Sequence, residues 1–215
     1  QFTRGLFIFL GTAFFYIAIT EIPLANALSL LLVAPIIVVV LSSFILKERI
    51  TLLKIICVLI GFVGTLLVIQ PGFTDFNLYS LYALISGLFY AMYLIYTRKV
   101  NFSSDSIVTL SYSTIPGAII MTLLIPFYWE SIPNLSQIII MGCIGPVVIV
   151  SHFFFIKAYQ YAEASTLAPI HYFEIVSNVL ISVLFFKDIP TIAVSIGIMC
   201  IISSGVLISI NQKNI

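Results

Sequence analysis

Charged residues are scarce in this 215-residue sequence, in which nine Lys or Arg and eight Asp or Glu make up 8% of the chain. A soluble domain averages about 25% charged and about 45–50% apolar residues, whereas 61% of this chain is hydrophobic and its mean hydropathy is +1.22. A soluble fold of this size could not cover its exterior with so few charges. The composition therefore excludes a soluble enzyme, a nucleic-acid-binding module and a disordered segment, and leaves an integral membrane protein.

Cysteine is also rare, and Cys57, Cys143 and Cys200 lie far apart, each within an apolar run. Their spacing matches neither a disulfide framework nor a metal site, so we expect small buried hydrophobic residues. The sequence contains no HExxH or GxSxG motif, which are signatures of metal-dependent and serine hydrolases. No cofactor, no metal and no enzymatic activity are expected.

Long apolar runs, by contrast, occupy nearly the whole chain. A membrane-spanning helix needs about 20 mostly apolar residues, and eight runs come close to or exceed that length, the first being the shortest. They cover residues 5–20, 22–46, 50–70, 76–97, 106–128, 136–156, 164–186 and 189–211. Charges, prolines and glycines separate them. The sequence therefore predicts an all-α membrane protein, a polytopic bundle of eight transmembrane helices.

The basic residues indicate how this bundle is oriented. If the eight spans alternate in direction, eight of the nine Lys and Arg residues fall on the side of the N-terminus, and only Lys187 falls on the other. An excess of basic residues is typical of the cytoplasmic side. We therefore expect a multi-pass protein of the inner or plasma membrane, with both termini of this chain in the cytoplasm.

Two parts of the chain resemble each other at an offset of 140 residues. Residues 17–67 align with residues 157–207, and each part contains a long span, a turn with a lysine and an acid, and a second span with small residues near its end. The lysines of the two turns, Lys47 and Lys187, fall on opposite sides of the membrane in the predicted topology. An inverted repeat of this kind is typical of secondary transporters.

Both copies of the repeat resemble the EamA module of the drug/metabolite transporter superfamily. The matching residues are 32–35, 46–51, Gly61 and Gly64 in the first copy and 168–174, 187–188 and 204–205 in the second. The resemblance is greatest to the branch of bacterial S-adenosylmethionine uptake transporters, from whose usual pattern the chain departs at Ile170 and His171.

This resemblance implies a division of the chain into two unequal parts. Family members are similar in having ten helices arranged as two inverted halves. Residues 1–70 would form the C-terminal part of the first repeat, with three spans, and residues 71–215 the second repeat, with five. The resemblance thus implies an inverted-repeat ten-helix transporter that lacks its first two helices, and the first residue, Gln1 instead of Met, agrees with that expectation.

Glu174 is the only acid deep within a predicted span. A charge at the middle of a membrane costs roughly 2.5–3.5 kcal/mol on insertion scales, and such residues commonly mark substrate paths. His171 lies three residues before Glu174 and Asn178 four residues after it, so all three share one helix face, whereas Tyr172 is less well aligned. A polar contact that holds helices together is the alternative explanation.

A second polar stripe lies on the span over residues 76–97, where Ser86, Tyr90 and Tyr93 recur at helical spacing. Tyr112 continues this pattern more weakly in the next span. Phenol groups and aromatic faces suit an organic solute with a cationic group, although packing between helices would produce the same pattern. The candidate substrate-binding residues are Glu174, Tyr172, His171, Asn178, Tyr90, Tyr93, Ser86 and Tyr112.

Together these features predict a secondary transporter that moves a small organic metabolite by alternating access between two inverted halves. S-adenosylmethionine or another amino-acid-like or nucleoside-like solute is the expected substrate. The expected partners are this small molecule and the lipid bilayer, with no nucleic acid, and a homodimer is compatible with the sequence. The alternatives are an intramembrane enzyme or a structural membrane subunit that uses the polar face of Glu174 and His171.

Overall fold

Every element of the described chain is helical. The computed structural model of the protein describes residues 1–72, 77–101, 105–128, 134–187 and 189–212. The helices in chain order are α1 (Phe2–Ala18), α2 (Leu24–Leu31), α3 (Ala34–Ile45), α4 (Leu52–Ile69), α5 (Leu78–Asn101), α6 (Ser106–Tyr128), α7 (Leu135–Tyr161), α8 (Ala164–Leu167), η1 (Ala168–Tyr172), α9 (Phe173–Ile181), η2 (Ser182–Phe186) and α10 (Ile192–Gln212). Within these residues, seven segments are long and apolar enough to cross a membrane, and α1 is a shorter apolar helix. The predicted all-helical membrane bundle is confirmed.

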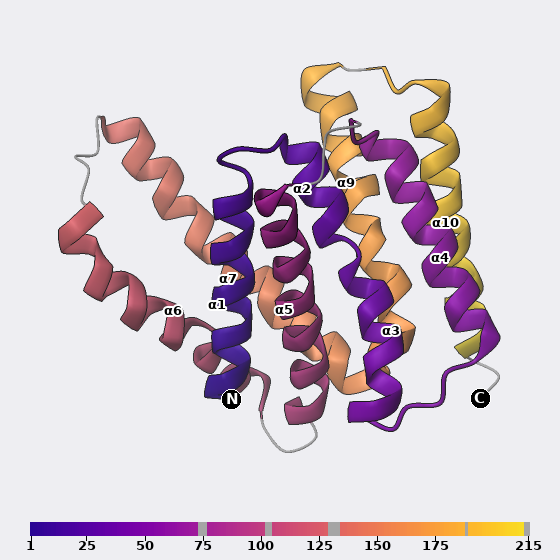
Figure 1. Cartoon of the computed structure of the whole chain (residues 1–215), viewed down its shortest axis with the longest axis horizontal. Coiled ribbons are helices and arrows are strands. Elements are labelled where there is room, and N and C mark those ends of the chain that lie inside the picture. The colour runs from indigo at the N-terminus through magenta and orange to yellow at the C-terminus, as the bar shows by residue number, and fades with distance from the viewer. Residues whose placement is uncertain (73–76, 102–104, 129–133, 188, 213–215) are drawn as a thin grey trace.

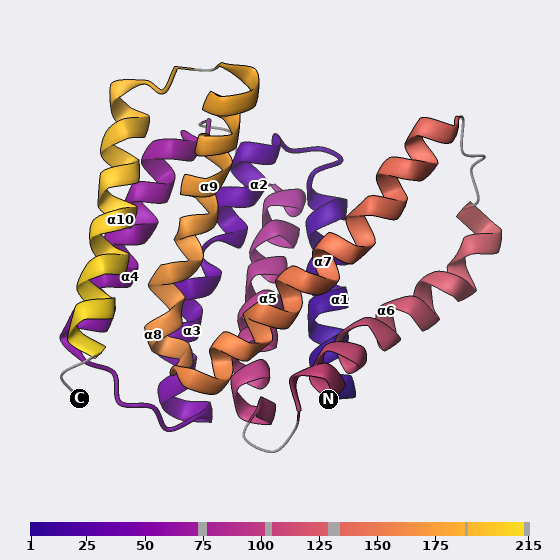
Figure 2. The ribbon, with the colours of Figure 1, turned by 180° about the vertical axis from the view of Figure 1, so that it is seen from behind.

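The helices form two groups with the broken spans between them (Figure 1). On one side α1 packs against α5 and α6, and on the other α4 packs along α10. The start of α1, the α3–α4 connection and the ends of α5, α7 and α10 all lie at the lower end of Figure 1, which we call the basal end. Seen from behind, α6 and the first part of α7 diverge from the remaining helices (Figure 2).

At the basal end, the buried side chain of Arg4 joins α1 to α5 and α6. Its guanidinium group donates hydrogen bonds to the Thr97 hydroxyl at 3.2 Å, to the Ser113 hydroxyl at 2.5 Å and to the Thr109 carbonyl. It also lies over the ring of Tyr93, 5.3 Å from the ring centre. Because four residues on two other helices surround it, Arg4 fixes how these three helices pack.

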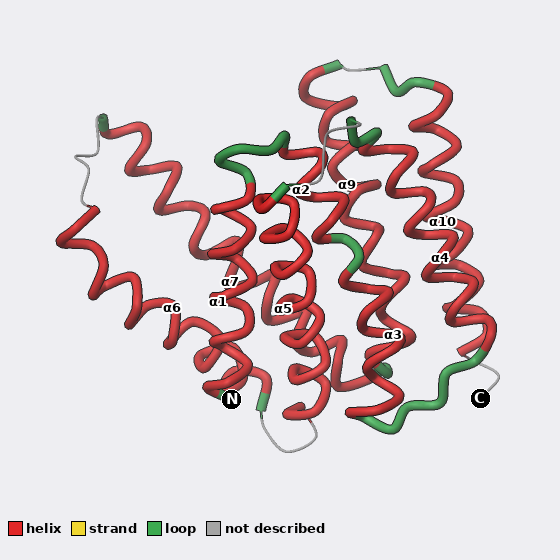
Figure 3. The backbone as a smooth tube through the Cα atoms, viewed as in Figure 1, coloured by secondary structure: helices red, strands yellow, loops and turns green. Residues whose placement is uncertain are grey.

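The predicted span over residues 22–46 is interrupted in its middle. Helix α2 ends at Leu31, and α3 begins at Ala34; Figure 3 shows a short non-helical segment between them. Pro35 lies in the first turn of α3, the position at which a residue without an N–H group is tolerated. The Ile36 N–H donates to the Val33 carbonyl at 3.0 Å, instead of to Leu32 as a regular α-helix would require.

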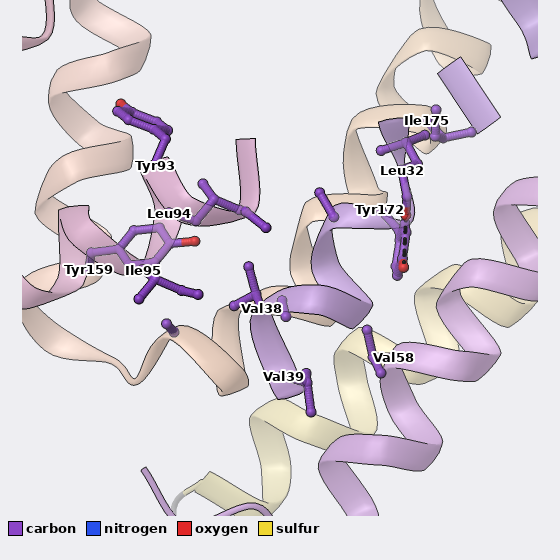
Figure 4. Packing of buried hydrophobic residues seen from close by; sticks show 14 of the residues in the cluster. Leu32, Val38, Val39, Val58, Tyr93, Leu94, Ile95, Tyr159, Tyr172 and Ile175 are labelled. Carbon is purple, nitrogen blue, oxygen red and sulfur yellow. Dashed lines mark hydrogen bonds between the residues drawn. The ribbon is translucent and has the colours of Figure 1, made fainter. Parts of the chain in front are cut away.

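The predicted span over residues 164–186 is irregular as well, and it contacts the first break. Pro169 is near the start of a 3₁₀ turn, η1, between α8 and α9. The hydroxyl of Tyr172 in this turn donates a hydrogen bond to the Leu32 carbonyl at 3.3 Å (Figure 4). The carbonyl that the first break releases is therefore bound by a side chain of the second broken span. The partners are 140 residues apart, which is the offset of the sequence repeat.

The two lysine-containing turns also share a backbone conformation. Lys47 and Lys187 both adopt the left-handed region, with φ of 57° and 59°, and they too are separated by the repeat offset. Asp188, the acid predicted beside Lys187, lies outside the described residues. Residues other than glycine rarely adopt a positive φ, so its occurrence at matching positions supports the repeat.

Candidate functional site

A pocket of about 300 Å³ lies between α5, the basal part of α7 and the α8–α9 segment. Its lining consists of Tyr90, Phe155, Ala158, Tyr159, Leu167, Ile170, His171 and Glu174. This volume is at the lower end of the range found for small-molecule sites, which are typically apolar concavities with a few polar groups. The pocket therefore has the size and the composition of a site for a small organic molecule.

Three aromatic rings from α5 and α7 surround the His171 imidazole. The ring centre of His171 lies 5.5 Å from that of Phe155 and 6.2 Å from those of Tyr90 and Tyr159. The Tyr90 and Phe155 rings meet the imidazole at steep angles, 80° and 61°. Such edge-to-face contacts are favourable because the ring edges and faces carry opposite partial charges. The imidazole is consequently held in one orientation at the wall of the pocket.

The Tyr159 hydroxyl and His171 Nε2 form a hydrogen bond of 2.7 Å. The backbone carbonyl of Tyr159 in turn accepts a hydrogen bond from Arg98 Nη1 at 2.7 Å. Arg98 lies in the last turn of α5, so this chain of bonds connects α5, α7 and η1. It holds the rings on these elements together on one side of the pocket.

Glu174 lies at the start of α9, one turn after His171, and its side chain is exposed. It is the one carboxylate in the lining of the pocket, and no Lys or Arg belongs to this lining. A carboxylate close to aromatic faces favours a cationic group of a bound molecule, because both attract positive charge. The electrostatics of the pocket thus disfavour an anionic ligand.

The structure brings three of the eight predicted site residues, Tyr90, His171 and Glu174, together in the lining of the pocket. Tyr93 is buried behind this wall, where its ring stacks on those of Tyr90 and Phe155. The remaining four predicted residues lie elsewhere. Ser86 is fully buried further along α5, Asn178 and Tyr112 are exposed outside the lining, and Tyr172 is buried in the core.

Tyr172 points away from the pocket, toward α4 and the break between α2 and α3. Its ring lies so close to Gly61 that a β-carbon at that position would approach Tyr172 Cδ2 to 2.5 Å. Figure 4 shows Tyr172 beside Leu32 in the core, on the side away from Tyr93 and Tyr159. The position of Tyr172 assigns it to the packing of the two broken spans.

Replacement of Tyr172 by phenylalanine tests this assignment. The variant loses the bond to Leu32, and hydrogen bonds between membrane helices contribute about 0.6 kcal/mol on average. We expect the thermal midpoint to fall by about 1–3 °C, at about 2–4 °C for each kcal/mol, with an unchanged KM for uptake. A rise in KM without loss of stability would instead assign Tyr172 to the pocket.

Phe155, Tyr159 and Ile170 line the pocket but were not predicted from the sequence. The spacing of four residues between Phe155 and Tyr159 is a signal for a shared helix face. The consecutive run Phe153, Phe154 and Phe155 hides this signal, because a helix with aromatic residues on all sides shows no preferred face. What distinguishes Tyr159 from the other aromatic residues of this helix is its hydrogen bond to His171, a tertiary contact that the sequence does not reveal.

Replacement of Tyr159 by phenylalanine removes one hydroxyl and keeps the ring that packs 5.1 Å from Phe155. The net contribution of a hydrogen bond is about 0.5–1.5 kcal/mol, so we expect a rise of about two- to tenfold in the KM for uptake. Tyr161→Phe is the matched control, since Tyr161 is exposed on the last turn of the same helix. Equal KM values in both variants would exclude a role of the Tyr159 hydroxyl in the site.

Two further features were compared with this pocket. A groove of about 330 Å³ between α3 and α4 is lined by aliphatic and aromatic side chains and Ser43, and it offers a single hydroxyl for orienting a polar molecule. Among the residues that the structure describes, no three His, Cys, Asp or Glu side chains are grouped so that they could hold a metal ion. The pocket beside Glu174 is therefore the best-supported candidate site.

A bundle of membrane helices with a polar pocket beside a broken span is typical of membrane transporters. Comparison with known families supports this class: residues 1–70 and 77–210 match the model of the EamA-like transporter family. The chain belongs to this family, and it is a multi-pass membrane protein.

Relatives and a solved structure extend over almost the entire chain. The chain is 27% identical to an S-adenosylmethionine uptake transporter of Rickettsia conorii, over 98% of its own length and 71% of that protein. It is 25% identical to a pseudopaline exporter of Pseudomonas aeruginosa, over 98% of its length and 74% of that protein. A crystal structure that is 18% identical superimposes on 99% of the chain, and on 76% of the solved chain, with a TM-score of 0.83, which supports the fold.

The names of these two relatives differ in both solute and direction of transport. Membership of a family whose named relatives are transporters supports membrane transport. It does not identify the solute, which has to be inferred from the pocket.

Proposed function

We propose that the protein is a secondary transporter that moves a small organic metabolite across the inner or plasma membrane by alternating access. The observation that carries this proposal is the pocket beside the broken span α8–α9, in which Glu174 lies one turn from a His171 ring enclosed by Tyr90, Phe155 and Tyr159. Broken helices around a site within the membrane are a common way in which transporters bind a solute and expose it to either side.

The proposed halves are residues 1–70 and residues 71–215, related as an inverted repeat. Two structural facts support this division. Tyr172 binds the carbonyl of Leu32, its counterpart 140 residues earlier, and contact between counterparts is expected close to a pseudo-two-fold axis. Lys47 and Lys187, also counterparts, share the left-handed conformation. The pocket is lined by residues of the second half, and rocking of residues 1–70 against this half would expose it to each side in turn.

The proposed solute carries a cationic group together with a planar or apolar part. Glu174 supplies the charge that would contact the cation, and the surrounding rings supply apolar and cation–π surface. S-adenosylmethionine or another amino-acid-like or nucleoside-like solute meets these requirements. The uptake transporter of Rickettsia conorii supports the first of these as the initial compound to test.

The proposed orientation places the basal end in the cytoplasm, with both termini of this chain. The α3–α4 connection and the ends of α5 and α7 lie there (Figure 1), and they carry Lys47, Arg49, Arg98, Lys99 and Lys157. Basic residues are enriched on the cytoplasmic side of membrane proteins, which supports this orientation.

The decisive experiment is an uptake screen with purified protein in lipid vesicles. Radiolabelled S-adenosylmethionine is the first solute, and amino acids and nucleosides compete with it in separate samples. Saturable, protein-dependent uptake that a cationic competitor inhibits more strongly than an anionic one would support the proposal. Absence of saturable flux for every compound, with protein folded in the vesicles, would contradict it.

A further inference from the structure

An ion pair at the basal end joins the buried side chain of Lys54 to the partly exposed Glu163, which lies between α7 and α8. Lys54, in the first turn of α4, is 7% exposed, and its ammonium group contacts the Glu163 carboxylate. It also donates to the Ser165 hydroxyl at 2.9 Å and to the Arg49 carbonyl at 3.0 Å. Three acceptors from two separate parts of the chain thus surround this ammonium group, which was expected from the sequence only to mark the cytoplasmic side.

Glu48 completes this arrangement from the α3–α4 connection. Its carboxylate accepts hydrogen bonds from the backbone N–H groups of Ala164 and Ser165 at 2.8 and 2.9 Å, and from the Ser165 hydroxyl at 2.6 Å. Bonds to an ionised acceptor are among the stronger hydrogen bonds in proteins. We call Glu48, Lys54, Glu163 and Ser165 the Lys54 cluster.

The Lys54 cluster connects the two proposed halves directly next to the pocket. Glu48 and Lys54 belong to residues 1–70, whereas Glu163 and Ser165 belong to residues 71–215. Ser165 lies on the four-residue helix α8, whose last residue, Leu167, lines the pocket. Figure 2 shows α8 beside the basal end of α3, and these two elements are in contact. Movement of α8 away from α3 would therefore break the cluster and displace Leu167, which lines the pocket.

The opposite end of the repeat has no counterpart of this ion pair. At the offset of 140 residues, Lys54 corresponds to Val194, Glu163 to Pro23 and Ser165 to Ala25. These residues have no charged side chain, so an ion pair between the counterparts of Lys54 and Glu163 cannot form. The ion pair that the described part of the chain shows between the proposed halves thus lies at the basal end.

We propose that the Lys54 cluster is a gate that closes the pocket toward the basal end, and that this gate opens by separating Lys54 and Glu48 from α8. This inference rests on the proposed division into two moving halves. The pocket then opens to the opposite side with the cluster intact, and it opens to the basal side only when the cluster is broken. Substitutions that weaken the cluster shift the population toward the state open at the basal end.

Thiol labelling at the pocket tests the gate without any solute. The parent protein has its three native cysteines, Cys57, Cys143 and Cys200, replaced by alanine and carries a single new thiol at Ala158→Cys, an exposed position in the pocket lining. A membrane-impermeant maleimide is applied to the basal side or to the opposite side in vesicles of known orientation. The rate of labelling from each side reports how far the pocket is open there.

In this parent we expect Lys54→Glu to increase the rate of labelling from the basal side by about fivefold or more, the lower end of typical coupling between conformational states. The double variant Lys54→Glu/Glu163→Lys restores an ion pair of opposite direction and should return the rate to about twice the parent rate or less. Arg49→Glu is the matched control, because it makes the same charge change at an exposed residue of the α3–α4 connection, just before α4.

The result that overturns the gate is an unchanged basal rate in Lys54→Glu, or an equal increase from both sides, which would indicate general loosening. Failure of the double variant to lower the rate would also contradict an electrostatic gate. If the parent shows saturable uptake but its labelling rate does not change in Lys54→Glu, the gate is contradicted and the transport proposal is not. If the labelling rate changes in Lys54→Glu but no solute is transported, the transport proposal is contradicted and the gate is not.

Discussion

Replacement of Glu174 by glutamine is expected to abolish or uncouple uptake while leaving insertion of the protein into the membrane intact. Glutamine has almost the same shape as glutamate and removes only the charge. Since Glu174 is the one carboxylate in the pocket lining, no neighbouring lining residue can replace it as the partner of a cation. Hydrogen bonds to charged groups contribute about 1.5–3 kcal/mol, which corresponds to an increase of about ten- to 150-fold in the KM for a cationic solute.

The measurement is the initial rate of uptake in vesicles over a range of solute concentrations, with the amount of folded protein determined by size-exclusion chromatography. Glu21→Gln is the matched control, because Glu21 is an exposed acid in the α1–α2 connection, away from the pocket. Insertion of the Glu174 variant should be undisturbed, since neutralising a charge within the membrane lowers the cost of insertion. Uptake at the wild-type rate by Glu174→Gln would contradict the proposed role.

The positions of the helices were largely predictable from hydropathy, but the breaks within them were not. Residues 22–46 and 164–186 are apolar throughout apart from isolated positions, and hydropathy depends on side chains alone. A break releases backbone groups that need partners, and the partner of the Leu32 carbonyl is Tyr172, 140 residues later. Pro35 and Pro169 lie within these spans, but a proline in a first turn and a proline in a kinked helix look the same in a sequence.

The central part of the candidate site could be predicted because it depends on local geometry. Glu174 was conspicuous as a charge in an apolar run, and its spacing from His171 places both on one side of a helix. His171 lies in η1 and Glu174 in the first turn of α9, and both line the pocket although the helix type changes between them. Tyr172, one residue after His171, points away from the pocket toward Gly61.

The contacts between distant segments could not be predicted in the same way. Lys54 and Glu163 are 109 residues apart, and each lies next to a predicted boundary, where a charge normally needs no partner because it reaches solvent. Arg4 likewise fitted the pattern of a basic residue at the cytoplasmic side, although its side chain is fully buried among hydroxyl and carbonyl groups. Both pairings depend on how the helices are arranged in space.

The close approach of α4 and α10 depends on two glycines that face each other. A β-carbon at position 64 would lie 2.7 Å from the Gly197 carbonyl oxygen, and one at position 197 would lie 2.6 Å from that of Gly64. Both distances are to backbone atoms, which cannot turn aside as a flexible side chain can. Membrane helices associate mainly by such close packing, so this contact supports the long interface between α4 and α10 (Figure 1).

Replacement of Gly64 or Gly197 by valine is therefore expected to force the two helices apart and to give the largest loss of stability among the variants considered. Overpacking typically costs about 1–3 kcal/mol and sometimes more, which corresponds to a fall of about 2–12 °C in the thermal midpoint measured in detergent. Gly142→Val is the matched control, because no atom lies within 4 Å of a β-carbon built at that position of α7. If all three variants unfold at the same temperature as the wild type, the glycine contact is dispensable. If only Gly64→Val and Gly197→Val lose stability, the close approach of α4 and α10 is required for the stability of the bundle.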